Sequence, residues 1–311
     1  MLLTKLQNNN EHVEINYTVE NKLHSFLESY LNDPLSVAVL ADFDWTLTKR
    51  YDYGSNKTLG SSYQIYDESA IGGSQKEREA HHKKLFDKYH KYEVDTSIDF
   101  KKRDFMLRRW YTESLSSYVN KRFTKDSIKN MIEKQRGNFS FRNYAKEFIE
   151  SVIGLNIPFI VISAGLGDII EGALRDLIPR FDEYVKDKKL CIISNKFKFN
   201  EKGECYGIDE NIIYTFNKSH FSGNYIKTNF PKIKNVFIMG DNLKDYNATD
   251  NLNLEKNKII GVGFVNILPE DKEKEKKINE FKNVYDINLI GDSSFKGFAN
   301  LFREIKNYQL N

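Results

Sequence analysis

The chain lacks the sequence features that define several common classes of protein. Its 311 residues include only two cysteines, Cys191 and Cys205, which is too few for a disulfide scaffold, and their spacing matches no zinc motif. Lys and Arg (47) exceed Asp and Glu (44) by three, which excludes a bulk polycation for nucleic-acid binding but allows a local basic cleft. No apolar run approaches the roughly 20 residues that span a bilayer, and residues 1–7 contain no signal-peptide core. These absences predict a cytoplasmic protein.

Short apolar runs are present instead, and each runs into a small or acidic residue. Residues 35–41 lead into Asp42, residues 157–162 into Ser163, and residues 235–239 into Gly240 and Asp241. Continuous apolar runs of this length, rich in β-branched residues, are typical of strands buried on both faces of a parallel sheet. A fourth run covers residues 258–264, and helical patterns at 141–153 and 168–177 lie between the runs. The pattern predicts an α/β fold whose ligands gather at the carboxyl ends of the strands.

The first two predicted strands are too far apart for a simple crossover. About 115 residues separate Asp42 from Ile157, and most of them have helical patterns, at 75–92, 100–123 and 125–136. We therefore predict a helical cap domain at residues 55–145, inserted into an α/β core formed by residues 1–54 and 146–311. A small β-hairpin extension is predicted from residues 190–199 and 204–216, which flank a turn at 200–203. The charged stretch 271–277 is predicted to be a solvated helix face.

The strongest chemical signal follows the first predicted strand. Residues 42–48 read Asp-Phe-Asp-Trp-Thr-Leu-Thr, so Asp42 and Asp44 lie where the backbone leaves the sheet. Buried carboxylates need a cation or hydrogen bonds to compensate their charge. A lone Asp-X-Asp is usually a turn with a helix cap, but the complete string resembles the first motif of the haloacid dehalogenase superfamily of phosphotransferases.

The later motifs of that superfamily are present in the expected order. Ser163 follows a predicted strand and precedes Ala164-Gly165-Leu166-Gly167-Asp168, where a hydroxyl and backbone N–H groups can bind phosphate. Lys218 follows at the place of the phosphate-binding cation. Residues 240–245, Gly-Asp-Asn-Leu-Lys-Asp, resemble the acidic motif and contain Asp241 and Asp245. Taken singly, a serine such as Ser163 is more commonly a helix cap, a Gly-Asp pair is more commonly a turn, and a lysine is more commonly a surface residue.

Longer strings resemble one branch of the superfamily, the eukaryotic-type cytosolic pyrimidine 5'-nucleotidases of the cytosolic 5'-nucleotidase III family. They are residues 162–168, 215–218 and 238–245, with shorter strings at 61–63, 89–95 and 110–114, so the likeness covers most of residues 35–290. Two departures bear on the preferred base. Lys244 stands where many members have Gly, and Trp110-Tyr111 stands where a Trp pair is usual.

The resemblance implies a Rossmann-like parallel-sheet core of the haloacid dehalogenase type and a magnesium-dependent 5'-nucleotidase of nucleotide metabolism. The expected substrates are nucleoside 5'-monophosphates, mainly CMP and UMP, which are hydrolysed through an aspartyl-phosphate. Asp42 would be the nucleophile, Asp44 the general acid and base, and Lys218 the cation beside the phosphate. The side chains of Asp42 and Asp241 and the backbone carbonyl of Asp44 would bind Mg²⁺.

The remaining site residues are also implied by the resemblance. Asp245 would orient the water shell of the metal or Lys218, and Ser163 and Ala164 would bind the phosphate. Glu93 and Ser114, in the predicted cap, would contact the base, because cytosine and 7-methylguanine both offer N–H donors to a carboxylate. No nucleic-acid polymer or membrane is expected as a partner, and a monomer is favoured.

Three alternatives remain open from the sequence. The enzyme could prefer 7-methylguanosine monophosphate, or it could be a phosphatase for a small metabolite such as phosphoserine. A non-catalytic binding module is the third, although Asp42, Asp44, Lys218 and Asp241 are all intact. Histidines 81, 82 and 90 lack metal-ligand spacing and are predicted to be solvated.

Overall fold

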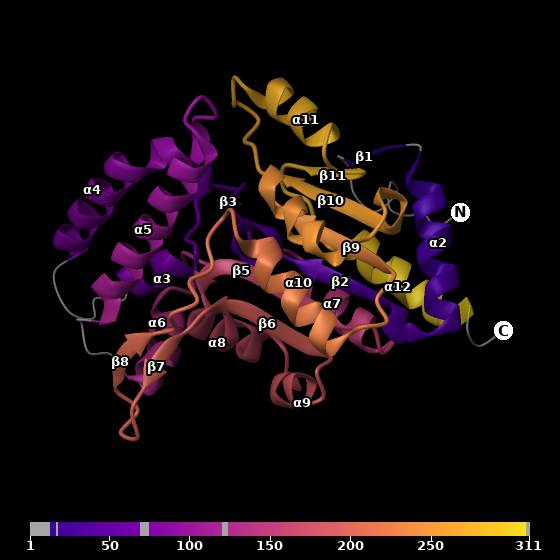
Figure 1. Cartoon of the computed structure of the whole chain (residues 1–311), viewed down its shortest axis with the longest axis horizontal. Helices are drawn as coiled ribbons and strands as arrows, with labels where there is room; N and C mark the ends of the chain where they lie inside the picture. The colour runs from indigo at the N-terminus through magenta and orange to yellow at the C-terminus, as the bar shows by residue number, and fades with distance from the viewer. Residues whose placement is uncertain (1–12, 17, 69–74, 120–123, 309–311) are drawn as a thin grey trace.

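A parallel sheet forms the centre of the molecule (Figure 1). The computed structural model describes residues 13–16, 18–68, 75–119 and 124–308. Its seven-stranded sheet has the order β1-β11-β10-β9-β2-β5-β6, and only β1 runs antiparallel to its neighbour. The strands are β1 Val13–Ile15, β2 Val37–Ala41, β5 Phe159–Leu166, β6 Leu190–Asn195, β9 Asn235–Gly240, β10 Ile259–Val265 and β11 Ile287–Ile290. The predicted α/β fold is confirmed.

The apolar strands are explained by helices on both faces of the sheet. The helices around the sheet are α2 Val19–Asn32, η1 Pro34–Ser36, α7 Ala145–Ile153, α8 Gly167–Leu177, α9 Phe181–Lys186, α10 Lys218–Asn229, η3 Leu243–Leu252, η4 Lys256–Lys258, α11 Lys274–Lys282 and α12 Lys296–Tyr308. Alternate residues of β2 face opposite sides: Val37 and Val39 join the core beneath α2, α7, α8 and α12, whereas Ala38 and Leu40 pack toward α10 and η3. Both faces of the sheet are therefore covered by apolar side chains. This is why polar and apolar residues do not alternate along β2.

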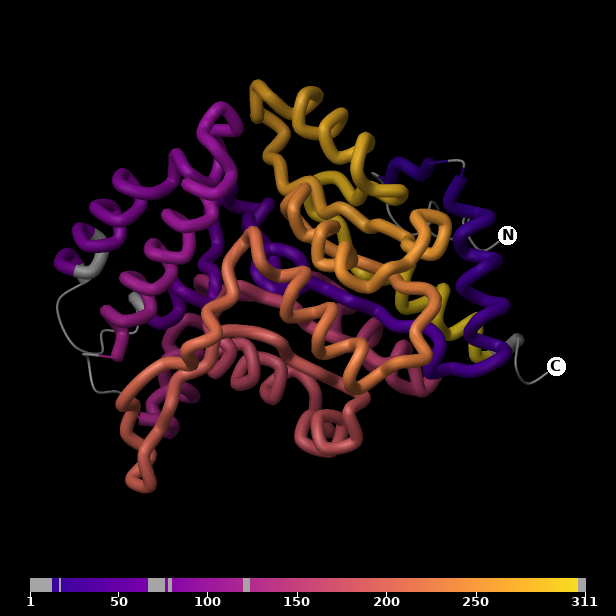
Figure 2. The backbone as a smooth tube through the Cα atoms, in the orientation of Figure 1, coloured from indigo at the N-terminus to yellow at the C-terminus, as the bar shows by residue number. Residues whose placement is uncertain are grey.

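A mostly helical segment follows β2 and lies to one side of the sheet. It contains the short pair β3 Tyr51–Asp52 and β4 Lys57–Thr58, then α3 Ser62–Glu68, α4 Gln75–Val94, α5 Phe100–Val119 and α6 Lys125–Lys134. Helices α4 and α5 lie side by side at the left of Figures 1 and 2, whereas α6 packs on α8. The domain boundaries at residues 54 and 145 stay a prediction.

Several predicted elements differ from those observed. Residues 190–195 are not a hairpin arm, because β6 pairs with β5 in the main sheet; the hairpin is β7 Phe197–Phe199 with β8 Cys205–Ile208, and residues 209–216 form no strand. Strand β5 continues through Ser163 to Leu166. The helix predicted at 141–153 begins at Ala145, because Phe141 forms a bridge with Thr48.

Some sequence predictions fall partly or wholly outside the described residues. The signal-peptide prediction concerned residues 1–7, and the end of the predicted helix 100–123 includes residues 120–123. Within the described ranges, no helix combines the length and the apolar character needed to cross a membrane.

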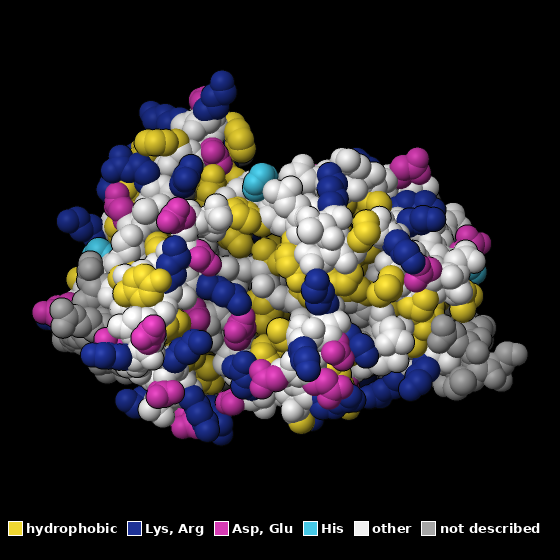
Figure 3. Space-filling view, turned by 60° about the horizontal axis from the view of Figure 1, so that its bottom comes forward, with side chains coloured by type: hydrophobic (Ala, Val, Ile, Leu, Met, Phe, Trp, Pro, Cys, Tyr) yellow, Lys and Arg dark blue, Asp and Glu magenta, His cyan; other side chains and the backbone are white. Residues whose placement is uncertain are grey.

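On the face shown in Figure 3, basic and acidic side chains are interspersed, and hydrophobic side chains gather around a hollow near its centre.

Candidate active site

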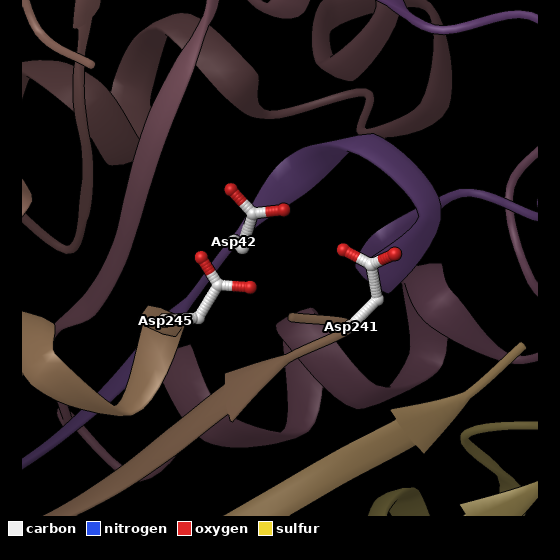
Figure 4. A group of neighbouring side chains, drawn as sticks. All are labelled: Asp42, Asp241 and Asp245. Atoms are coloured by element: carbon white, nitrogen blue, oxygen red, sulfur yellow. The ribbon is translucent and has the colours of Figure 1, made fainter. Parts of the chain in front are cut away.

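Three carboxylates meet at the carboxyl ends of β2 and β9. Asp42 follows β2, Asp241 follows β9, and Asp245 lies in the first turn of η3 (Figure 4). One oxygen of each lies within 4.8 Å of the others. The backbone N–H of Asp42 donates to the carbonyl of Met239 (2.9 Å), which joins the two strand ends. The sheet register therefore brings together residues about 200 positions apart.

Lys218 lies at the start of α10 and inserts its ammonium into this cluster. Its Nζ donates to Asp42 Oδ1 and Asp245 Oδ1, both at 2.7 Å, and all three side chains are buried. Burial alone would lower the pKa of Lys218, but the Asp245 and Asp42 carboxylates outweigh it, so that pKa is raised. Lys218 is therefore a fixed positive charge beside Asp42.

One ammonium does not neutralise three carboxylates, and the pKa values of Asp42 and Asp241 are both raised. Burial raises the pKa of Asp42 well above its usual range, against the opposing effect of Lys218. Burial, followed by repulsion from Asp245, raises the pKa of Asp241 to about 7. A divalent cation would remove this excess charge, and the oxygen-only ligands suit Mg²⁺. The residues present therefore fit a magnesium site.

The turn that carries Asp44 has a strained backbone. Trp45 has φ +61°, in the left-handed region that a bulky residue rarely adopts. Its carbonyl accepts from Arg142 Nη2 (2.9 Å) and Asn266 Nδ2 (3.0 Å), and its N–H donates to Thr48 Oγ1 (2.7 Å). Arg142 is 2% exposed and Asn266 also donates to Asp241 Oδ2 (3.3 Å), so buried contacts hold this turn in place.

Asp44 is bound by a residue from α3. The Ser62 hydroxyl donates to Asp44 Oδ2 and the Ser62 backbone N–H donates to Asp44 Oδ1, both at 2.7 Å. Burial raises the pKa of Asp44, and these two hydrogen bonds oppose that rise. A raised pKa suits a carboxyl group that must hold a proton and then release it.

The segment around Ser163 lies against Asp44. A Cβ on Gly165 would lie 2.8 Å from Asp44 Oδ2 and would collide with Ser62 Oγ, so only glycine fits this position. Ser163 is buried, and its Oγ accepts from the N–H of Gly165 (3.0 Å). The carbonyl of Ala164 accepts from Tyr63 and Asn195, both at 2.8 Å, which fixes the backbone beside the site.

Glu93 lies at the C-terminal end of α4, where α4 meets the loop before α10. Its Oε1 accepts from Thr215 Oγ1 (2.8 Å), and Thr215 Oγ1 lies 3.4 Å from the hydroxyl of Tyr111. Burial and then the Glu93 charge raise the pKa of Tyr111, and the charges of Lys218 and Asp42 also act on it. Glu93 therefore joins the end of α4 to the loop that precedes Lys218.

The position of Ser114 gives less support to its predicted contact with the base. Ser114 lies one turn after Tyr111 on α5, is half-buried, and in the described part of the chain its hydroxyl has no hydrogen bond to Glu93.

The structure thus brings most of the predicted residues together around the strand ends. Sequence reasoning missed the roles of Ser62, Tyr111, Arg142, Thr215 and Asn266. Ser62, Tyr111 and Thr215 gave a signal, because they lie in strings that resemble the family, whereas Arg142 and Asn266 gave none.

Comparison with known proteins identifies the chain at family level. A sequence model described as pyrimidine 5'-nucleotidase (UMPH-1) matches residues 45–306. The chain belongs to this family. It is accordingly a 5'-nucleotidase, a hydrolase of phosphoric monoesters, and the resemblance inferred from the motifs is confirmed.

Individual relatives agree with this assignment. The human 7-methylguanosine phosphate-specific 5'-nucleotidase is 28% identical over 86% of this chain and 84% of its own length. The putative cytosolic 5'-nucleotidase 3 of Caenorhabditis elegans is 27% identical over 82% of this chain and 65% of its own length. A crystal structure of cytosolic 5'-nucleotidase IIIB bound to cytidine matches with a TM-score of 0.76 and 21% identity, over 100% of this chain and 99% of that one. The last match supports the fold.

Proposed function

We propose that the enzyme hydrolyses nucleoside 5'-monophosphates in a magnesium-dependent reaction with Asp42 as nucleophile. The observation that carries the proposal is the buried contact of Asp42 with Lys218, beside Asp241 and Asp245. A carboxylate Oδ of Asp42 would attack phosphorus, and the bond to the 5'-oxygen would break as an aspartyl-phosphate forms. Lys218 would balance the negative charge of the phosphoryl oxygens.

Asp44 is proposed to move the protons. It would give its proton to the departing 5'-oxygen and then take one from the water that attacks the aspartyl-phosphate. That second attack releases inorganic phosphate and returns Asp42 to its free form. Ser62 supports this role because it binds both oxygens of Asp44 and fixes the direction of the carboxyl group. Ser163 and the amide of Ala164 are proposed to bind the phosphate.

The metal would be bound by Asp42, Asp241 and the carbonyl of Asp44, with Asp245 orienting Lys218. When bound, Mg²⁺ supplies positive charge to the phosphoryl oxygens and lowers the effective charge of the cluster. The raised pKa of Asp241 supports this assignment, because an ionised carboxylate is disfavoured there until a cation is present.

For the base, we propose that Glu93 accepts a hydrogen bond from a ring substituent or ring N–H, with Ser114 nearby. CMP and UMP are the first candidates, and the cytidine bound to the structurally similar nucleotidase supports them. The second candidate is 7-methylguanosine monophosphate, which the names of the human and other relatives favour. A cytosolic location stays a prediction, supported by the name of the nematode relative.

The decisive experiment is phosphate release from a panel of CMP, UMP, AMP, GMP, 7-methyl-GMP and phosphoserine, with Mg²⁺ and with excess chelator. We expect hydrolysis of CMP or 7-methyl-GMP that stops with chelator and returns with Mg²⁺. Preference for phosphoserine would favour the small-metabolite phosphatase, and no release from any substrate would favour the binding module. Full activity in excess chelator would refute the metal assignment.

A further inference from the structure

A lysine from the core of the fold binds the end of helix α4. Lys244, in the first turn of η3, donates from Nζ to the backbone carbonyl of Glu93 (2.7 Å). Glu93 lies in the last turn of α4, where carbonyl groups have no partner within the helix. A cation at this end is also favoured by the helix dipole. Lys244 therefore stabilises the helix end from outside the helical segment.

The same carbonyl has a second cationic donor. Arg103 of α5 donates from Nη2 to the Glu93 carbonyl (2.8 Å) and from Nε to the Tyr92 carbonyl (3.0 Å). The ring of Phe216 lies near both cations, 4.4 Å from Lys244 Nζ and 5.1 Å from the guanidinium carbon of Arg103. Each cation is attracted to the ring, which offsets part of the repulsion between the two charges. Arg103 acts within the helical segment, whereas Lys244 links it to the core.

The carboxylate and the backbone carbonyl of Glu93 are thus both bound by residues that are close in sequence to members of the catalytic cluster. Thr215, which binds its carboxylate, lies three residues before Lys218, and Lys244, which binds its carbonyl, directly precedes Asp245. Lys218 and Asp245 are themselves joined by a 2.7 Å ion pair. The position of Glu93 is therefore tied to the geometry of the catalytic cluster.

A second attachment of the helical segment to the core lies where the chain enters and leaves the segment. There the two connections to the core run side by side: the N–H of Gly60 donates to the carbonyl of Asn138 (2.6 Å), and the N–H of Lys49 donates to the carbonyl of Ser140 (2.9 Å). These contacts lie within the two stretches of chain that connect the helical segment to the core. Lys244 and the 214–216 loop contact the end of α4 from parts of the core that are distant from it in sequence.

We infer that Lys244 is a positioning residue that latches the end of α4 onto the core and holds Glu93 over the site before nucleotide binds. The inference rests on the proposed function and deepens it, since the latch determines how readily the base is recognised. When the binding-competent state is only partly populated, the apparent affinity falls by the populated fraction. Loss of the latch should therefore raise KM for nucleotides and leave kcat nearly unchanged.

The test compares Lys244→Met with Lys244→Arg and with Lys256→Met, which removes one exposed lysine elsewhere on the core. With the nucleotide that the enzyme hydrolyses best, Lys244→Met should raise KM about 10-fold, equivalent to about 1.4 kcal/mol, with kcat within about 2-fold. On p-nitrophenyl phosphate, which has no base, KM should change less than about 2-fold. Lys244→Arg should restore most of the nucleotide affinity, and Lys256→Met should resemble the parent enzyme.

Hydrogen exchange provides a readout that does not depend on activity. Amides in the last turn of α4 and in residues 214–218 should exchange faster in Lys244→Met than in the parent enzyme or Lys256→Met. Unchanged exchange there, or equal kinetic losses on nucleotide and p-nitrophenyl phosphate, would overturn the latch. If the parent enzyme hydrolyses no nucleotide, the proposed function fails, and the exchange comparison still decides whether Lys244 holds α4.

Discussion

The hydroxyl of Ser62 offers a sharp test of the role of Asp44. Ser62→Ala removes the 2.7 Å hydrogen bond to Asp44 Oδ2 and keeps the backbone N–H bond to Oδ1. It also removes the acceptor of the Leu166 N–H, which lies 3.2 Å from Ser62 Oγ in a buried position. The change therefore affects both the carboxyl group that we propose as acid and base and the end of β5.

The expected magnitude follows from these two contacts. A hydrogen bond to a charged group is worth about 1.5–3 kcal/mol, so kcat/KM should fall roughly 10- to 150-fold. The unpaired Leu166 N–H should lower the free energy of unfolding by about 1–3 kcal/mol. Because both bonds from Ser62 lower the pKa of Asp44, losing one should raise that pKa further. The pH at which Asp44 loses its proton should therefore move upward.

The assay is kcat/KM against pH for the parent enzyme, Ser62→Ala and Ser61→Ala, with denaturant unfolding of each. Ser61 is the matched control, because in the described part of the chain it has no hydrogen bond to Asp44. Gly165→Ala should disturb the same contact from the other side, since its Cβ would lie 2.8 Å from Asp44 Oδ2. A Ser62→Ala enzyme with parental rates and an unmoved pH profile would refute the assignment of Asp44 as the acid and base.

Three further predictions concern other residues. Asp42→Asn should lower turnover by several orders of magnitude with the fold intact, and a purified variant with a tenth of parental activity would exclude Asp42 as nucleophile. Glu93→Ala should reduce nucleotide kcat/KM roughly 10- to 150-fold while sparing p-nitrophenyl phosphate; equal losses on both would mean that Glu93 only supports the fold. Burial raises the pKa of Asp168 to about 6 from 3.8, so its ionised form destabilises the folded state and stability falls as the pH rises through 6. Asp168→Asn should therefore add up to about 3 kcal/mol to the free energy of unfolding at pH 7.5 and nothing at pH 3, and a pH-independent effect would contradict this origin.

The sequence by itself determined four strands of the sheet, β2, β5, β9 and β10, and the order of the motifs. The strands around Asp42 and Asp241 are continuous apolar runs because helices cover both faces of the sheet, and this burial is visible locally in composition. Parallel strands place their carboxyl ends at one edge, so the meeting of Asp42 with Asp241 followed from the motifs. The hairpin was misplaced because β6 and β7 follow each other with one residue between them, and an apolar run does not show where pairing changes partner.

Only the tertiary structure decided how the site is supported. Ser62 binds Asp44, Arg142 binds the carbonyl of Trp45, and Lys244 binds the carbonyl of Glu93 across a separation of 151 residues. Each contact depends on how the helical segment folds back onto the strand ends, and two of them end on backbone carbonyls, which carry no sequence signature. Serine, arginine and lysine are also common on surfaces, so their roles become visible only when burial and partners are known.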